Sequence, residues 1–372
     1  MRRKRWAVIG VALTLVVGFV TLAAWSRADR WPPRWVIPLP PRSWPQGFSP
    51  DGRSYLAADE SGWFAWDLAT GKVQESAEPP KIWNRSDAAD GRTYVGVGTT
   101  FTDRGESEVV WVNSASDAIR ARFPVRANLF LKLVLVGGGR SIRAVLGHFD
   151  QVRQRISIKE VMTWDLASGA EVRRPIAGPV GEDVEPMAYS RDARLCAYLD
   201  RPRGMIQVWD LEADRPEGEP LPASNVPLSQ LPSAVFTSDG QTLIVGRNDG
   251  RLAFYSLAES RLVKTFKVHP ADYLISGIGL SPDGRTLTST GVGPSQPSRL
   301  TRFWWACLDR IIPDWSLMLK CETVVIEVET GRVLARSSGS VTSRFSPDGR
   351  TIVTREWNWT LTARDAPQPG SR

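Results

Sequence analysis

Side chains that could carry out proton transfer or covalent catalysis are scarce in this chain of 372 residues. Histidine, the usual general acid or base near neutral pH, occurs only as His148 and His269, in separate parts of the sequence. The chain has no Gly-x-Ser-x-Gly turn, no His-Glu-x-x-His pair, no phosphate-binding glycine loop and no Cys-x-x-Cys pair. We therefore predict no catalytic and no cofactor-binding residue, and interpret both histidines as structural or surface side chains.

Repeated Asp-Gly pairs, such as Asp51-Gly52 and Asp283-Gly284, come closest to a metal-binding motif. A calcium loop needs several oxygen ligands at closely spaced positions, and these pairs lack such neighbours. Asp followed by Gly is, in contrast, common in tight turns. We interpret the pairs as turns and predict no metal site.

The three cysteines do not form a disulfide framework. Cys196 lies in an apolar strand pattern and is predicted to be an inert core thiol. Cys307 and Cys321 belong to one irregular segment and could form a disulfide if the compartment is oxidising.

The elements that must position these residues follow from a repeated turn with the consensus Ser-x-Asp-Gly-Arg. Its seven copies lie about 39 to 65 residues apart, and a period of roughly 40–50 residues built from short strands is typical of propeller blades. The best copies are residues 49–53, 281–285 and 346–350, and the weaker ones are 90–92, 137–140, 190–194 and 238–240.

Each repeat contains four short strands. One strand precedes the turn, a second follows it, and a third ends in an aromatic-acid pair such as Trp66-Asp67, Trp164-Asp165 or Trp209-Asp210. A further turn leads to an outer fourth strand, and four antiparallel strands make one blade. The sequence predicts an all-β fold, a seven-bladed β-propeller of four-stranded antiparallel blades, preceded by one N-terminal transmembrane helix.

On these motifs the chain resembles a degenerate WD-repeat (WD40-type) propeller. The segments Trp66–Gly71 and Trp164–Gly169 match its strand end most closely, and the resemblance covers about residues 34–366. It implies that the repeated tryptophans pack between blades and that the protein binds other proteins. The family's buried Ser/His/Asp/Trp network is expected to be absent from most blades, with His269 as the surviving histidine.

The N-terminus has the pattern of a membrane anchor. A basic flank (residues 1–5) precedes an uncharged run (6–26) long enough to span a bilayer, which predicts a cytoplasmic N-terminus and a propeller outside the cytoplasm, at a bacterial inner membrane. A signal peptide cleaved near Ser26-x-Ala28 is the alternative, and it would give a secreted protein. Residues 27–33 form a Pro/Trp-rich linker, and residues 367–372 a polar tail.

The net charge of +7 does not indicate nucleic-acid binding. Residues 1–30 carry about +5 of it, so the remainder of the chain is close to neutral and has no basic footprint.

The sixth repeat contains an apolar insertion at 295–322, between its second and third strands. Its large apolar residues, several at helical spacing, are possible partner-binding or cap residues: Phe303, Trp304, Trp305, Leu308, Ile311 and Trp315. Interfacial membrane contact is a third interpretation. It is the least favoured, because a chain entering as an outer strand would approach from the opposite face.

The last repeat has only three strands, whereas Trp35–Leu39 precedes the first repeat without a partner. We predict that it pairs with Trp359–Ala363 and closes the ring. The functional prediction is a membrane-anchored, extracytoplasmic protein-interaction scaffold with protein partners and no cofactor. The alternatives are a periplasmic ligand-binding propeller, and a propeller hydrolase or lyase with a site at the mouth of the channel.

Overall fold

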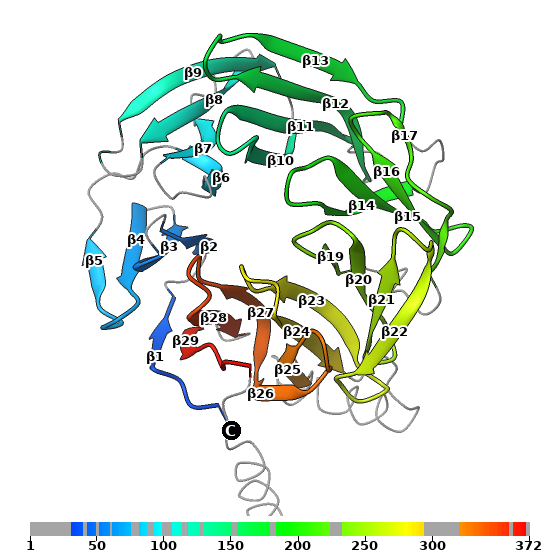
Figure 1. Cartoon of the computed structure of the whole chain (residues 1–372). Helices are drawn as coiled ribbons and strands as arrows, with labels where there is room; N and C mark the ends of the chain where they lie inside the picture. The colour runs from blue at the N-terminus through cyan, green and yellow to red at the C-terminus, as the bar shows by residue number, and fades with distance from the viewer. Residues whose placement is uncertain are drawn as a thin grey trace, which may run out of the picture.

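Seven antiparallel sheets surround a central axis as the blades of a propeller (Figure 1). The computed structural model describes residues 31–39, 43–49, 52–59, 62–75, 82–87, 93–98, 106–113, 116, 118–126, 129–150, 155–178, 184–223, 233–293, 320–356 and 360–369. Every regular element in these ranges is a β-strand, and the predicted all-β, seven-bladed architecture is confirmed.

Blades one to three follow the chain in order. They consist of β2 (Trp44–Phe48), β3 (Ser54–Asp59), β4 (Gly62–Asp67) and β5 (Val73–Glu75); β6 (Ile82–Asp87), β7 (Thr93–Gly98), β8 (Glu106–Asn113) and β9 (Ile119–Arg126); and β10 (Leu129–Val136), β11 (Ser141–Asp150), β12 (Arg155–Asp165) and β13 (Glu171–Pro175).

Blades four to seven continue this order, with two short outer strands in blade four. They consist of β14 (Val184–Tyr189), β15 (Leu195–Asp200), β16 (Met205–Asp210), β17 (Arg215–Pro216) and β18 (Leu221–Pro222); β19 (Ala234–Phe236), β20 (Thr242–Gly246), β21 (Arg251–Ser256) and β22 (Arg261–Lys267); β23 (Leu274–Leu280), β24 (Thr286–Gly293), β25 (Lys320–Glu327) and β26 (Val333–Ser338); and β27 (Ser340–Phe345), β28 (Thr351–Glu356), β29 (Thr360–Asp365) and β1 (Trp35–Pro38).

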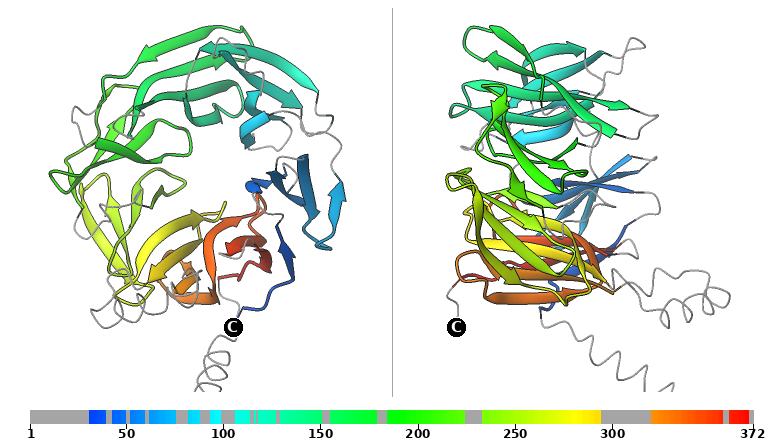
Figure 2. Two further views of the ribbon diagram at one scale, coloured as in Figure 1. Left: turned by 180° about the vertical axis from the view of Figure 1, so that it is seen from behind. Right: turned by 90° about the vertical axis from the view of Figure 1, so that its right-hand side faces the viewer.

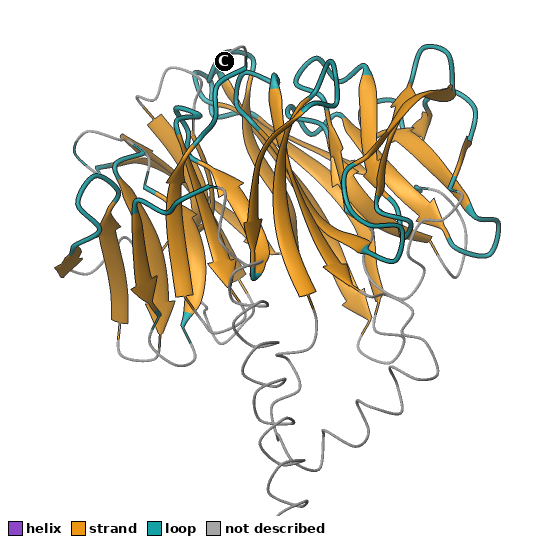
Figure 3. Ribbon diagram, turned by 90° about the horizontal axis from the view of Figure 1, so that it is seen from below, coloured by secondary structure: helices purple, strands orange, loops and turns teal. Residues whose placement is uncertain are grey.

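The first strand of each blade lies nearest the axis, and the strands run between the two faces of a disc (Figures 2 and 3). One face carries the repeated turns between first and second strands and the turns between third and fourth strands. We call it the Asp-Gly face. The opposite face carries the connections between second and third strands and the links from one blade to the next.

The repeated turn has a defined hydrogen-bond pattern. In blade six, Ser281 Oγ donates to Asp283 Oδ1 at 2.6 Å, and the backbone N–H of Arg285 donates to the same oxygen at 3.0 Å. Gly284 has a φ of 73°, a left-handed conformation in which most side chains are strained. The Asp and Gly of the consensus are therefore explained by turn chemistry, as predicted.

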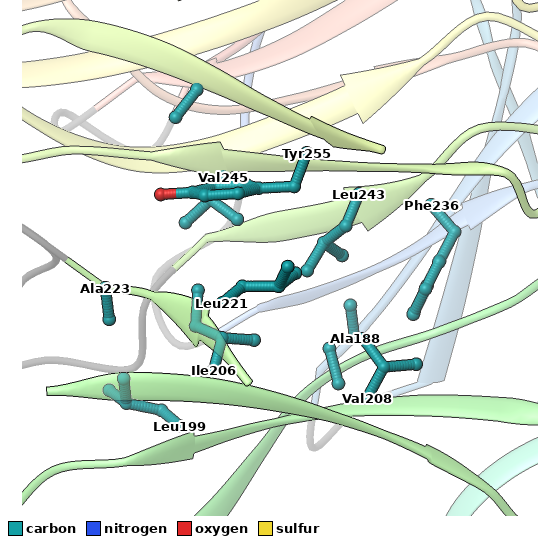
Figure 4. Packing of buried hydrophobic residues seen from close by; sticks show 12 residues of the cluster. Ala188, Leu199, Ile206, Val208, Leu221, Ala223, Phe236, Leu243, Val245 and Tyr255 are labelled. Atoms are coloured by element: carbon teal, nitrogen blue, oxygen red, sulfur yellow. The ribbon is translucent and has the colours of Figure 1, made fainter. Parts of the chain in front are cut away.

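The core lies between blades. Between blades four and five, Leu199, Ile206 and Val208 face Leu243 and Val245 (Figure 4), and all five side chains are almost completely buried. Burial of this kind stabilises a protein by about 25 cal/mol per Å² of apolar surface, so contacts between blades hold the ring together.

The predicted core role of the repeated tryptophans is confirmed for Trp66 and Trp164, each 1% exposed. The indole N–H of Trp164 donates to Glu171 at 3.0 Å, as expected for a local bond. That of Trp66 is buried and has no hydrogen-bond partner among the residues that the structure describes, so a local bond is not shown for every repeated tryptophan. Both observations agree with packing as the main role of these side chains.

The ring closes as predicted, because the outer strand of blade seven comes from the other end of the chain. β1 pairs antiparallel with β29, with Trp35 opposite Ala363 and Pro38 opposite Thr360. Strand β1 is adjacent to the C-terminal strand in Figure 1.

Trp31, which the sequence analysis places in the linker, also packs into the propeller. It is 7% exposed, and its indole N–H donates to the carbonyl of Asp365 at 2.9 Å. Arg364, 1% exposed, donates from Nε to the carbonyl of Trp31 at 3.0 Å. Ordered contacts therefore begin before β1.

In the described part of the chain, no helix has the length and apolar character of a membrane span. Residues 1–30, which contain the predicted anchor, lie outside that part. The anchor and the cleaved signal peptide both stay predictions.

Candidate functional site

The candidate site is the base of the insertion in blade six. Gly293 ends β24, Lys320 begins β25, and the two residues are paired. The insertion thus connects second and third strands, as predicted, while Lys320, Cys321 and Glu322 belong to β25. The remaining predicted site residues lie outside the described residues: Phe303, Trp304, Trp305, Cys307, Leu308, Ile311 and Trp315.

The cysteines occupy two different environments. Cys321 is 4% exposed and lies opposite Val292, but its predicted disulfide partner Cys307 is not among the described residues. The disulfide therefore stays a prediction. Cys196 is completely buried between blades three and four, and this burial raises its thiol pKa far above the ordinary value. A thiol held in its protonated form is a poor nucleophile, consistent with an inert core role.

A buried polar network joins all the strands that meet at this base. His269, 2% exposed, places Nε2 2.9 Å from Ser289 Oγ on β24 and Nδ1 2.7 Å from Glu322 Oε1 on β25. On β26, Arg336 donates from Nη1 to the same Glu322 oxygen at 3.2 Å and from Nη2 to the carbonyl of Val268 at 3.1 Å. One histidine before β23 is thereby fixed to β24, β25 and β26.

The network keeps Glu322 ionised. Burial raises the pKa of this carboxyl, but the hydrogen bond from His269 and the charges of His269 and Arg336 outweigh burial and lower it. Tyr273 stacks on His269, with ring centroids 6.1 Å apart and planes within 5°. Burial, followed by the nearby Glu322 charge, raises the pKa of Tyr273 to about 12, so this phenol is neutral at physiological pH.

Two glycines allow the rings to approach the sheet. A Cβ on Gly291 would lie 2.7–2.9 Å from atoms of the His269 ring, and one on Gly293 would lie 2.3 Å from the Tyr273 ring. Such distances are shorter than real side chains adopt, so the network requires glycine at both positions.

The contacts from Ser289 to His269 and from His269 to Glu322 connect a hydroxyl, an imidazole and a carboxylate, as in the catalytic triad of serine hydrolases. Ser289 is 0% exposed, however, so a substrate cannot contact its hydroxyl in this conformation. The arrangement instead fixes the end of the blade from which the insertion leaves.

Sequence reasoning identified His269 but missed its partners. The carboxylate of the network is Glu322 on the third strand. His269 and Glu322 are 53 positions apart, and no local motif connects them. Only the pairing of β24 with β25 brings them together.

The described residues contain no group of three or more His, Cys, Asp or Glu side chains placed to bind a metal ion. They do form hollows. One of about 480 Å³ lies on the Asp-Gly face across blades three to five, between the turn 137–139 and the turns containing Arg191 and Asp239. Another, of about 190 Å³, lies between blades three and four, and we call it the blade 3–4 cavity.

Comparison with known proteins supports the fold. No protein-family model and no curated protein matches the chain. The β-propeller domain of Cps50 (Swd1) from Myceliophteria thermophila superimposes with a TM-score of 0.54 at 13% identity, over 89% of this chain and 99% of that domain. The chain is a seven-bladed β-propeller. At this identity the likeness concerns the fold alone.

Proposed function

We propose that this chain is a membrane-tethered protein-interaction scaffold outside the cytoplasm. The observation that carries the proposal is that the described residues next to the two unusual segments lie at opposite faces of the disc. Trp31 lies at the Asp-Gly face beside Asp365, whereas Gly293 and Lys320 lie at the opposite face. A tether attached through residues 1–30 would leave the insertion side of the disc available to a partner.

The fold supports binding rather than chemistry. A WD40-like ring offers two broad faces and a rim on a rigid frame, and such propellers commonly serve in protein assembly. The His269 network holds the base of the insertion in one geometry, as a binding segment requires. We assign the insertion residues Phe303, Trp304, Trp305 and Trp315 to partner contact, with a cap on the propeller as the competing role.

Affinity capture from native membranes tests the scaffold. We expect the full chain to retain a protein partner that is lost when Phe303, Trp304, Trp305 and Trp315 are all replaced by alanine. Replacement of Val36 by alanine is the matched control, because this valine is 52% exposed on the outer strand β1. Identical capture by all three proteins would remove the insertion from the binding surface.

The tether has its own test. A reporter active only outside the cytoplasm, fused after Arg372, should be active because the basic flank holds the N-terminus inside. A stable but silent fusion would contradict the topology.

A second candidate, binding of a small polar ligand, is favoured by the hollow of about 480 Å³ on the Asp-Gly face. Its size lies in the range of ligand sites, and Arg191 offers a charged contact there. Saturable thermal stabilisation by a library of small polar anions, lost on Arg191→Ala, would establish it.

A further inference from the structure

Four junctions between blades can be compared at one structural position. It is occupied by the outer-strand residue that lies opposite the third-last residue of the third strand: Trp35, Lys264, Ala335 and Val172. At the junction of blades seven and one this residue is Trp35, which packs over Gly71 and donates its indole N–H to the carbonyl of Leu68 at 2.9 Å.

The junction of blades five and six uses the same position. Lys264 lies opposite Phe254 and donates to the carbonyl of Val328 at 2.9 Å, while Phe266 covers Gly331. Leu68 and Val328 are equivalent, because each directly follows the last residue of its blade's third strand. A large outer-strand side chain therefore fills both junctions and donates to the same carbonyl.

Between blades six and seven the equivalent outer-strand residue is only Ala335, opposite Val325. Here Trp31 fills the junction from outside the sheet. It packs with Val325, Ile352 and Ala366, and it is followed by Pro32 and Pro33 before β1 begins. The molecule itself thus shows that a tryptophan on an extended, proline-flanked segment can occupy such a junction.

Between blades three and four the position is left open. The equivalent residue is Val172, opposite Thr163, and it is 57% exposed. Valine is short and has no donor for the carbonyl of Leu211, the counterpart of Leu68. The result is the blade 3–4 cavity of about 190 Å³, lined by Arg143, Val161, Thr163, Val172, Arg174, Ala193, Leu211 and Glu212.

The cavity has the size and chemistry for an aromatic ring. An apolar protein cavity of about 150 Å³ is large enough to bind benzene. Val161, Ala193 and Leu211 supply buried apolar wall. Arg143 and Arg174 also line the cavity, and their guanidinium groups donate to the carboxylate and the carbonyl of Glu212, respectively. Arginine side chains stack favourably on aromatic faces.

We propose that the blade 3–4 cavity binds a tryptophan side chain presented by an extended, proline-flanked segment of a protein partner. This inference rests on the proposed scaffold function and names the chemistry of one partner contact. The Trp31 segment of a second copy is a poor occupant, because Trp31 is already buried in its own chain.

The probe is a fluorescent peptide that copies residues 29–34 (DRWPPR), tested against the full chain by fluorescence anisotropy. We expect saturable binding that is lost when the peptide tryptophan is replaced by alanine. Val172→Trp should place an indole ring over the cavity and weaken binding more than tenfold. Val36→Trp, on a comparably exposed outer-strand valine, should leave binding unchanged. Should Val172→Trp fail to fold, Val172→Phe introduces a smaller ring.

Binding that Val172→Trp and Val36→Trp both retain, or no saturable binding, would overturn the inference. If the peptide does not bind but affinity capture still retains a protein partner, the scaffold function is supported and the blade 3–4 cavity is not its contact site. Self-association abolished by Val172→Trp would show that the occupant is another copy of the chain, which also overturns the assignment to a different protein.

Discussion

The closing blade and blade six each bury a basic side chain beside an aromatic ring. The two side chains differ in the groups with which they form hydrogen bonds. In the closing blade, Arg364 lies 5.3 Å from the centre of the Trp31 ring. Two of its hydrogen bonds go to neutral oxygens, the carbonyl of Trp31 and Thr354 Oγ1. Neither oxygen belongs to an acid that is protonated at low pH, so these two bonds do not depend on the ionisation of a carboxyl group.

In blade six, His269 stacks on Tyr273 and contacts a carboxylate, that of Glu322. The strength of this contact depends on whether the Glu322 carboxyl group is ionised. The two regions also differ in sequence separation: 334 positions lie between Trp31 and Asp365, but only 53 between His269 and Glu322. The closing blade should therefore control global stability, and blade six a local stability that depends on pH.

The largest effect should come from removing the N-terminal strand. A chain starting at Ser43 lacks Trp31 and all of β1, whereas one starting at Trp31 keeps both. We expect the shorter chain to lose more than about 5 kcal/mol of unfolding free energy, because buried Trp31 and half-buried Trp35 are absent and blade seven is left incomplete. Thermal unfolding measures the loss, and deletion of residues 367–372 is the control. Equal melting temperatures for the two N-terminal starts would contradict closure by β1.

Replacing Trp31 alone should cost less. Trp31→Ala removes the ring beside Arg364 and leaves a cavity against Val325 and Ile352, which typically costs about 3–5 kcal/mol. Trp31→Phe should lose less, because it keeps an aromatic ring and gives up the bond to Asp365. Chemical denaturation of the three proteins would rank them, and a Trp31→Ala chain as stable as wild type would show that the contact is unimportant.

Glu322→Gln tests the pH dependence of blade six. The folded-state pKa of Glu322 is lowered, so its contribution is complete above its unfolded pKa of about 4.3 and is lost as the pH falls through the folded value. We expect Glu322→Gln to cost about 1.5–3 kcal/mol at pH 7. This difference in unfolding free energy should shrink toward pH 3. A difference that stays constant with pH would refute an ionised Glu322 facing His269, Arg336 and Tyr273.

Gly291→Ala should have the smallest effect, and it tests the packing of His269. The added methyl would meet the imidazole ring at 2.7 Å, so the ring must shift, at a cost of about 1–3 kcal/mol. Gly277→Ala on β23 is the control, since the nearest atom there is 3.5 Å away. Equal melting temperatures for Gly291→Ala and Gly277→Ala would show that the His269 ring can move away from the added methyl group at little cost in stability.

The fold could be predicted because its signals are local. The turns at 49–53, 281–285 and 346–350 fix the repeat, and Trp66-Asp67 and its relatives mark the third strands. Even the closing strand could be inferred, because Trp35–Leu39 had no partner and the last repeat lacked one strand. Each turn and each aromatic-acid pair lies beside the strands that it predicts, whereas the closing strand follows from the number of strands in the first and last repeats.

The sites were harder to predict because they depend on which side chains face each other across blades. Glu322 and Arg336 gave no sequence signal, and Trp31 looked like part of a linker. The importance of Val172 lies in being smaller than Trp35 and Lys264 at an equivalent register. These three residues can be recognised as equivalent only when the pairing of each outer strand with its third strand is known. The repeat pattern of the sequence does not give that pairing.

Closure by β1 has a consequence for biosynthesis. Strand β1 is made long before β29, and at roughly 5–20 residues per second the 334 positions between Trp31 and Asp365 take on the order of 20–70 s to synthesise. During that time β1 is an unpaired edge that could associate with a neighbouring nascent chain. Pro32, Pro33 and Pro38 lack the N–H needed for strand pairing. We therefore expect these prolines to act as protection against aggregation during synthesis as well as to shape the finished edge.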